Sequence, residues 1–157
     1  MPVEVGQQAP AFTLPSHTGE NVSLADFRGE KNVVLVFFPA AFSGICTKQF
    51  SEIGAAEARY AGEDAQVLGI SVDNHNSLRA WAETLGLGDT LLLSDFHPKG
   101  AVATEYGAHF EKAGMNTRAS FVIDREGIVR YAEIGENPGH WIEQEAYFSP
   151  GLPACSV

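Results

Sequence analysis

The sequence predicts an α/β fold in which helices cover both faces of a central mixed sheet, with a short hairpin before it. Two runs at positions 32–38 and 66–72 are rich in β-branched and other apolar residues, as in strands that are buried on both faces. Apolar residues at helical spacing follow each run. Near position 125 this alternation of strand and helix gives way to a hairpin pattern.

The composition predicts one acidic domain. The chain has 157 residues and a formal net charge of −10, which argues against nucleic-acid and anionic-membrane partners because both need clustered cations. We expect one domain over residues 1–157, with a flexible tail from about position 149. No apolar run approaches the roughly 20 residues of a membrane span, and the first residues lack a secretion signal. We therefore expect a cytoplasmic protein.

The first elements are a hairpin, a strand and a helix. Residues 12–14 and 22–24 flank a polar turn and predict the hairpin. The strand at 32–38 ends at Pro39, and residues 43–60 carry apolar side chains close to a 3.6-residue period. This predicted helix contains Cys46 in its first turn.

The later elements continue the pattern. The strand at 66–72 leads into a helix that Gly86 ends, and a short strand follows at 90–94. The remaining predicted elements are a helix at 98–106, a hairpin of 120–124 with 128–134, and a last helix at 139–148. This order matches a thioredoxin-like core with an N-terminal hairpin extension.

Cys46 is the candidate nucleophile. A thiol reacts as its thiolate, and the first turn of a helix offers free N–H groups and the positive end of the helix dipole. The dipole typically contributes only about 0.3–1 kcal/mol, so a cation or direct hydrogen bonds must also stabilise the anion. Ser43 lies one turn before Cys46, and its hydroxyl is a candidate donor to the thiolate or to a substrate oxygen. A simple N-cap is the alternative for Ser43, and it is compatible with this role.

The segment around Cys46 resembles a known family. Pro39, Ser43 and Cys46 match the Pro-x-x-x-Thr/Ser-x-x-Cys signature of peroxiredoxins, and the context of residues 37–46 is most similar to the alkyl hydroperoxide reductase E group. The resemblance extends from Gly6 to about Trp141. It implies a thioredoxin-like fold, a homodimer, and a thiol-dependent peroxidase that reduces hydrogen peroxide and organic hydroperoxides without a metal or other cofactor.

The resemblance also implies roles for other residues. Arg118, just before the run Phe-Val-Ile-Asp, matches the arginine that holds the thiolate and the peroxide in this family. By itself an arginine at this position would more often be a surface ion-pair partner, as we expect for Arg125. Where many relatives carry glutamate, this chain has Gln49, whose oxygen is able to orient Arg118 but adds no charge.

The expected reaction begins when the Cys46 thiolate attacks one peroxide oxygen. Ser43, Arg118 and the Cys46 backbone N–H would then stabilise the departing oxygen. The resulting sulfenic acid must be reduced by a thiol, supplied by a thioredoxin- or glutaredoxin-type protein or by a low-molecular-weight thiol.

Other functions are less well supported by the sequence. A dithiol oxidoreductase is disfavoured because no Cys-x-x-Cys is present, and the five histidines have no spacing that suggests a metal site. A redox sensor or stress-activated binding module that uses the same cysteine is the alternative function.

Cys155 is the second cysteine, in a tail with two prolines and one glycine. A mobile thiol there could resolve the Cys46 sulfenic acid by forming a disulfide. Against this, the resembled group typically works with one cysteine, and nothing near Cys155 would lower its pKa. Both a resolving and an incidental Cys155 stay open.

Overall fold

The structure is a computed structural model, and it describes residues 3–148 and residue 152. The tail predicted from position 149, including Cys155, lies outside the described residues apart from Leu152. The elements in chain order are β1 (Thr13–Pro15), β2 (Asn21–Ser23), the 3-10 helix η1 (Leu24–Phe27), β3 (Asn32–Phe37), α1 (Gly44–Ala55), α2 (Glu57–Gly62), β4 (Ala65–Ser71), α3 (His75–Ala82), β5 (Leu91–Ser94), α4 (Ala101–Tyr106), β6 (His109–Phe110), the 3-10 helix η2 (Glu111–Ala113), β7 (Met115–Asn116), β8 (Ala119–Ile123) and β9 (Val129–Ile134).

The central sheet has the strand order β5-β4-β3-β8-β9. Strands β3, β4 and β5 run parallel, whereas β8 is antiparallel to β3 and to β9. Every residue of β3 is buried, because this strand has a neighbour on each side and is covered on both faces. The mixed sheet and its central strand at the first apolar run are as the sequence predicts.

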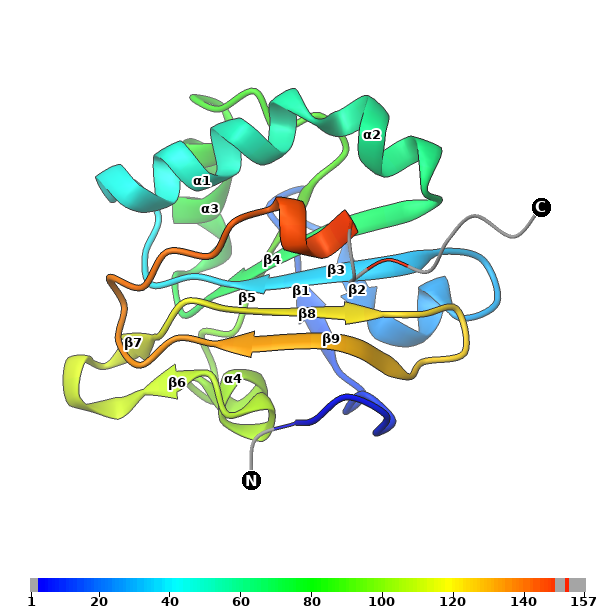
Figure 1. Ribbon diagram of the computed structural model, residues 1–157. Helices are drawn as coiled ribbons and strands as arrows, with labels where there is room; N and C mark the ends of the chain where they lie inside the picture. Colours follow the sequence, from blue (N-terminus) through cyan, green and yellow to red (C-terminus); the bar gives the residue numbers. More distant parts are fainter. Residues whose placement is uncertain (1–2, 149–151, 153–157) are drawn as a thin grey trace.

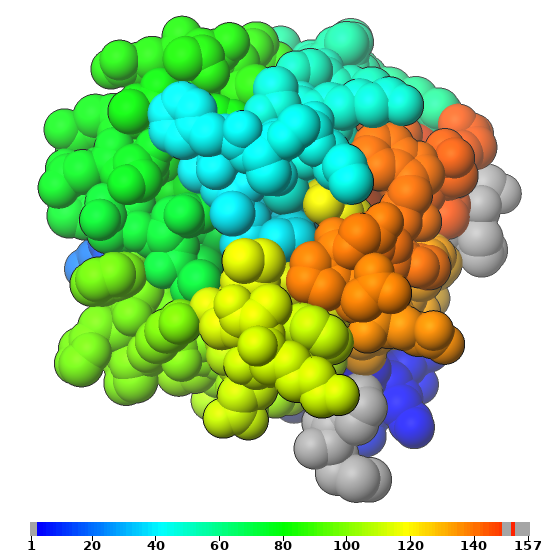
Figure 2. All heavy atoms as spheres, turned by 90° about the vertical axis from the view of Figure 1, so that its left-hand side faces the viewer, coloured from blue at the N-terminus to red at the C-terminus, as the bar shows by residue number. Residues whose placement is uncertain are grey.

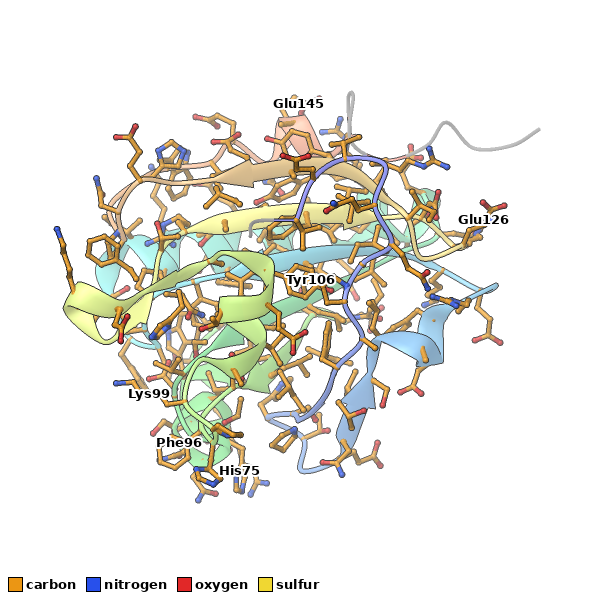
Figure 3. The ribbon with its side chains drawn as sticks, turned by 90° about the horizontal axis from the view of Figure 1, so that it is seen from below. His75, Phe96, Lys99, Tyr106, Glu126 and Glu145 are labelled. Carbon is orange, nitrogen blue, oxygen red and sulfur yellow. The ribbon has the colours of Figure 1, made fainter. Side chains whose placement is uncertain are left out.

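Two layers cover the sheet (Figure 1). Helices α1, α2 and α3 lie on one face, and α4 lies on the other face with the β1–β2 hairpin. Side chains of β3 alternate between the two cores, since successive residues of a strand point to opposite faces. Figure 3 shows Tyr106 at the centre of the face that carries α4, and its hydroxyl donates to the Pro10 carbonyl at 2.6 Å. This is the predicted thioredoxin-like architecture with its N-terminal hairpin.

The predicted helix at 43–60 is two helices. The backbone of Ala56 (φ −97°, ψ 15°) separates α1 from α2. Glycine is unfavourable inside a helix, but packing requires it at position 54, because a Cβ there would lie 1.6 Å from the Gly86 carbonyl oxygen. The glycine therefore allows α1 to approach the loop after α3.

The predicted helix at 139–148 is wrong over its first half, residues 139–143. Only residues 144–148 form a short helical turn. The segment is held by contacts with the preceding helices: Gln144 Nε2 donates to the Glu52 carbonyl at 3.3 Å, and the Tyr60 hydroxyl donates to Gln144 Oε1 at 2.8 Å. Contacts with other helices cannot be predicted from the spacing of apolar residues within the segment.

The helix predicted at 98–106 begins later than expected. Helix α4 starts at Ala101 because the buried Asp95 carboxylate accepts the N–H groups of Val102 (3.2 Å) and Ala103 (3.0 Å). Gly107 ends it in the left-handed conformation (φ 80°), as predicted.

The sheet brings distant segments to one edge. Phe37, the last residue of β3, pairs with Ala119, the first residue of β8, because the two strands are antiparallel. The loop that leads from β3 to Cys46 and the residue before β8, Arg118, therefore meet at the same edge. The end of β4 lies there too, since β4 is parallel to β3. Among the described residues, no helix is long and apolar enough to cross a bilayer.

Candidate active site

Cys46 lies in the first turn of α1 and is fully buried. Ser43 is the N-cap, with extended backbone angles (φ −69°, ψ 149°), and its Oγ accepts the Cys46 N–H at 3.3 Å. The Cys46 backbone N–H, which we expected to stabilise the departing oxygen, therefore already donates to Ser43. Because Oγ uses a lone pair in this bond, the Ser43 hydroxyl hydrogen is free to donate elsewhere.

The loop between β3 and α1 begins at the buried Pro39 and is fixed from the neighbouring strand. The Asp73 carboxylate, just beyond β4, accepts the Ala41 N–H at 2.8 Å and the Ser71 hydroxyl at 2.7 Å, both through Oδ2. Phe42 adopts a left-handed backbone conformation (φ 68°), which is rare for a large side chain. Sequence reasoning missed Asp73, although a polar residue at the end of a strand parallel to β3 is a usable signal.

Arg118 points its guanidinium at Cys46. The side chain is only 1% exposed, and both Nη1 and Nη2 lie 3.4 Å from the Cys46 sulfur. An arginine fork stays charged at every working pH and offers donors in fixed directions. The arrangement suits a sulfur that carries negative charge.

Two neutral oxygens complete the hydrogen bonding of Arg118. Nη1 donates to Gln49 Oε1 at 2.5 Å, and Nη2 donates to the Pro138 carbonyl at 3.3 Å. The Arg118 Nε is buried without a hydrogen-bond partner. The structure thus brings together the predicted residues Cys46, Arg118, Ser43 and Gln49.

Tyr147 lies close to this cluster and was not found from the sequence. It is fully buried, and its hydroxyl is 2.6 Å from the Ser120 hydroxyl on β8. Burial raises the pKa of Tyr147 to about 12, although Ser120, Gln49 and the charge of Arg118 act in the opposite direction. The phenol therefore stays protonated at neutral pH.

The segment after β9 forms one wall of the site. Its Pro138 carbonyl contacts Arg118, and His140 Nε2 lies 2.7 Å from a Glu133 carboxylate oxygen. Lys48, from α1, lies over the Trp141 ring at 5.1 Å. Figure 2 looks onto this face, where the cyan segment at the start of α1, the yellow segment leading into β8 and the orange segment after β9 meet.

Other candidate residues are elsewhere. Arg125 forms an ion pair with Asp64 at 2.6 Å on the surface, as expected. In the part of the chain that the structure describes, no group of three or more histidine, cysteine, aspartate or glutamate side chains is placed to hold a metal ion.

Comparison with known proteins gives the family. The sequence pattern of the AhpC/TSA family matches residues 5–132. Alkyl hydroperoxide reductase E of Mycobacterium tuberculosis is 41% identical over 145 residues, which is 92% of this chain and 94% of that protein. Peroxiredoxin TSA2 of Saccharomyces cerevisiae is 34% identical over 87% of this chain and 72% of that protein. The crystal structure of Enterococcus faecalis AhpC, 30% identical, superposes with a TM-score of 0.84 over 96% of this chain and 91% of that chain.

These likenesses cover both the sequence and the fold. The chain therefore belongs to the AhpC/TSA family, as a peroxiredoxin of the alkyl hydroperoxide reductase E group and thus a thiol-dependent peroxidase.

Proposed function

We propose that Cys46 is the nucleophile of this peroxidase and that Arg118 and Ser43 stabilise the charges that develop in its reaction. The observation that carries the proposal is the pair of 3.4 Å contacts from the Arg118 nitrogens to a buried sulfur. A guanidinium placed there favours the thiolate, the reactive form of cysteine. Pro39 lies two residues beyond the end of β3, at the start of the loop before α1.

The reaction is a two-electron oxidation of sulfur. The Cys46 thiolate attacks one oxygen of the hydroperoxide, an S–O bond forms as the O–O bond breaks, and the second oxygen leaves as alkoxide or hydroxide. Arg118 and the free hydrogen of Ser43 stabilise that oxygen until it takes a proton and departs as alcohol or water. Cys46 is left as a sulfenic acid.

A thiol completes the cycle. Two reductant thiols restore the Cys46 thiol from its sulfenic acid and become a disulfide, with loss of water. We propose a thioredoxin- or glutaredoxin-type protein or a low-molecular-weight thiol as the reductant. Hydrogen peroxide and organic hydroperoxides are the proposed substrates.

Trapping of the intermediate tests the assignment. One equivalent of hydrogen peroxide, followed by dimedone and peptide mass spectrometry, should label Cys46 as the sulfenic acid in a Cys155→Ser background. Peroxide consumption without a modified Cys46 would contradict the proposal. Steady-state turnover with excess reductant separates an enzyme from the alternative of a redox sensor, which would oxidise once and stop.

We also propose a homodimer that uses the surface beside the active site. Phe42, in the loop, and Ile45, in the first turn of α1, are 58% and 46% exposed, so two large apolar side chains within four residues face solvent. Ile45→Glu should give a monomer in sedimentation velocity. Val5→Glu, at an equally exposed valine (59%), is the control and should keep the wild-type state.

A cytoplasmic location is a further proposal. It rests on composition: a chain with two cysteines is typical of a reducing compartment, where thiols stay free. Fractionation of the source cells would test it, and recovery outside the cytoplasm would contradict it.

A further inference from the structure

The turn of the β1–β2 hairpin lies against the edge of the central sheet. Strand β5 is the outermost strand on that side, and Ser16 forms an isolated antiparallel bridge with its Leu93. The next residue of the turn, His17, bonds twice to Leu92: its backbone N–H donates to the Leu92 carbonyl at 2.8 Å, and the Leu92 N–H donates to His17 Nδ1 at 3.1 Å. Both backbone groups of Leu92 at the sheet edge are therefore bonded to this one histidine.

The imidazole of His17 takes the place of a backbone carbonyl. In a regular antiparallel pair of this kind the two residues exchange both of their N–H···O bonds. Here the His17 carbonyl instead accepts Arg79 Nε, from α3, at 3.2 Å. The ring nitrogen therefore supplies the acceptor that the Leu92 N–H needs.

This bond fixes the protonation state of the His17 ring. A backbone N–H only donates, so Nδ1 must keep its lone pair, and the neutral ring carries its hydrogen on Nε2. An imidazolium has two donors and no acceptor, so protonation of Nδ1 breaks the bond. Leu92 is fully buried, and its N–H would then be unpaired away from water, which is costly.

The charges around His17 also oppose a charged ring. From α3, Arg79 faces the turn, whereas β1, β2 and β5 carry no titratable side chain. Within the turn, the other titratable residue is Glu20, which is exposed. Burial lowers the pKa of His17 from its ordinary value of 6.5, and the positive charge of Arg79 acts in the same direction. The native position of the turn therefore favours the neutral ring.

We propose that His17 is a pH-sensitive clamp: its neutral ring holds the hairpin turn on the edge of β5, and its protonation releases the turn and uncovers that edge. The strands of the hairpin stay in place, because Leu14 and Val22 are buried in the core on this face of the sheet. The opening is thus confined to residues 16–20. The proposal goes beyond the peroxidase reaction and does not depend on the role of Cys46.

The direction of the pH effect follows from the lowered pKa. The released ring has an ordinary pKa and binds a proton more readily than the clamped ring does. The clamp is therefore fully effective above pH 6.5 and weakens as the pH falls below that value. Because one proton is taken up on opening, the opening equilibrium changes by up to about tenfold per pH unit.

Hydrogen exchange at the Leu92 amide tests the proposal. The measurement is its protection factor by NMR, corrected for the intrinsic exchange rate, at about pH 7.5 and about pH 5. In the wild-type protein we expect protection to fall by about tenfold or more at the lower pH. His17→Asn should keep its protection, since the asparagine oxygen is an acceptor close to the position of Nδ1 and does not titrate. His17→Ala should be poorly protected at both pH values.

A matched control is His97→Asn, at an exposed histidine, which should show the wild-type pH dependence. Equal loss of protection in wild type and His17→Asn would overturn the proposal, because acid would then act elsewhere. Constant protection in wild type, or normal protection in His17→Ala, would overturn it too.

A second measurement uses the wild-type protein and needs no variant to fold. The nitrogen chemical shifts of the His17 ring at neutral pH should show a hydrogen on Nε2 and an unprotonated Nδ1. A hydrogen on Nδ1 would mean that the ring does not accept the Leu92 N–H, and the clamp would be refuted.

Discussion

Arg118 holds both terminal nitrogens of its guanidinium 3.4 Å from the sulfur of Cys46, across 72 positions of sequence. Both residues are buried, so the contact is fixed by the position of α1 and of the residue that precedes β8.

Cys46→Ser should abolish peroxide reduction while the fold is retained. The substitution exchanges one atom in a packed site, but a serine hydroxyl stays protonated and is a poor nucleophile there. The measurement is peroxide consumption with excess thiol, with circular dichroism as the control for folding. Wild-type consumption by the folded variant would contradict the role of Cys46.

Arg118→Lys should be nearly as inactive as Arg118→Ala. One ammonium group is unable to replace two nitrogens that contact the sulfur together and also reach Gln49 and Pro138. We expect the second-order rate with peroxide to fall by about two orders of magnitude, as for the loss of one transition-state donor. Stopped-flow measurement of Cys46 oxidation checks this, and a lysine variant at near wild-type rate would contradict it.

Two substitutions separate the capping role of Ser43 from its role in the reaction. Ser43→Ala should lower the free energy of unfolding by about 1 kcal/mol, whereas Ser43→Gly should lower it by only a few tenths, because glycine is an acceptable N-cap. Both lack the hydroxyl, so both should react more slowly with peroxide, while Ser43→Thr should retain the rate. A peroxide rate that is normal in Ser43→Gly and reduced only in the less stable Ser43→Ala would show that the hydroxyl has no part in the reaction.

Asp73→Asn should slow peroxide reduction without touching the sulfur. Asp73 Oδ2 accepts two hydrogen bonds that fix the loop before Cys46, and hydrogen bonds to a charged acceptor are worth roughly 1.5–3 kcal/mol each. Loss of stability in urea together with a reduced peroxide rate is the expected result. Asp89→Asn, at an exposed carboxylate, is the control, and equal effects of the two substitutions would contradict the positioning of the loop by Asp73.

The role of Cys155 can be decided by mass spectrometry after one equivalent of peroxide without reductant. If Cys155 resolves the intermediate, a disulfide with Cys46 forms rapidly, and Cys155→Ser accumulates the sulfenic and then the sulfinic acid of Cys46. Equal persistence of the sulfenic acid in both proteins would rule resolution out. The external thiol would then attack Cys46 directly.

The strand before Pro39, the helix that begins beside Ser43 and the hairpin near position 125 could be predicted without any structure. These features rest on local properties, namely burial patterns of period 2 or 3.6 and the conformational limits of proline and glycine. Of the candidate site, the resemblance to a family motif was enough to predict Cys46, Ser43 and Arg118, and to show that Gln49 replaces the glutamate of many relatives.

Which distant groups meet at the site depends on how the strands and helices pack together. Strand order and the pairing of Phe37 with Ala119 place Arg118 beside Cys46, and the parallel neighbour β4 brings Asp73 under the loop. The segment after β9 was predicted as a helix from position 139, but residues 139–143 are not helical, and contacts of Gln144 with α1 and α2 fix only the short turn that follows. Contacts of this kind depend on the positions of several elements at once, so the hydrophobic periodicity of one segment does not predict them.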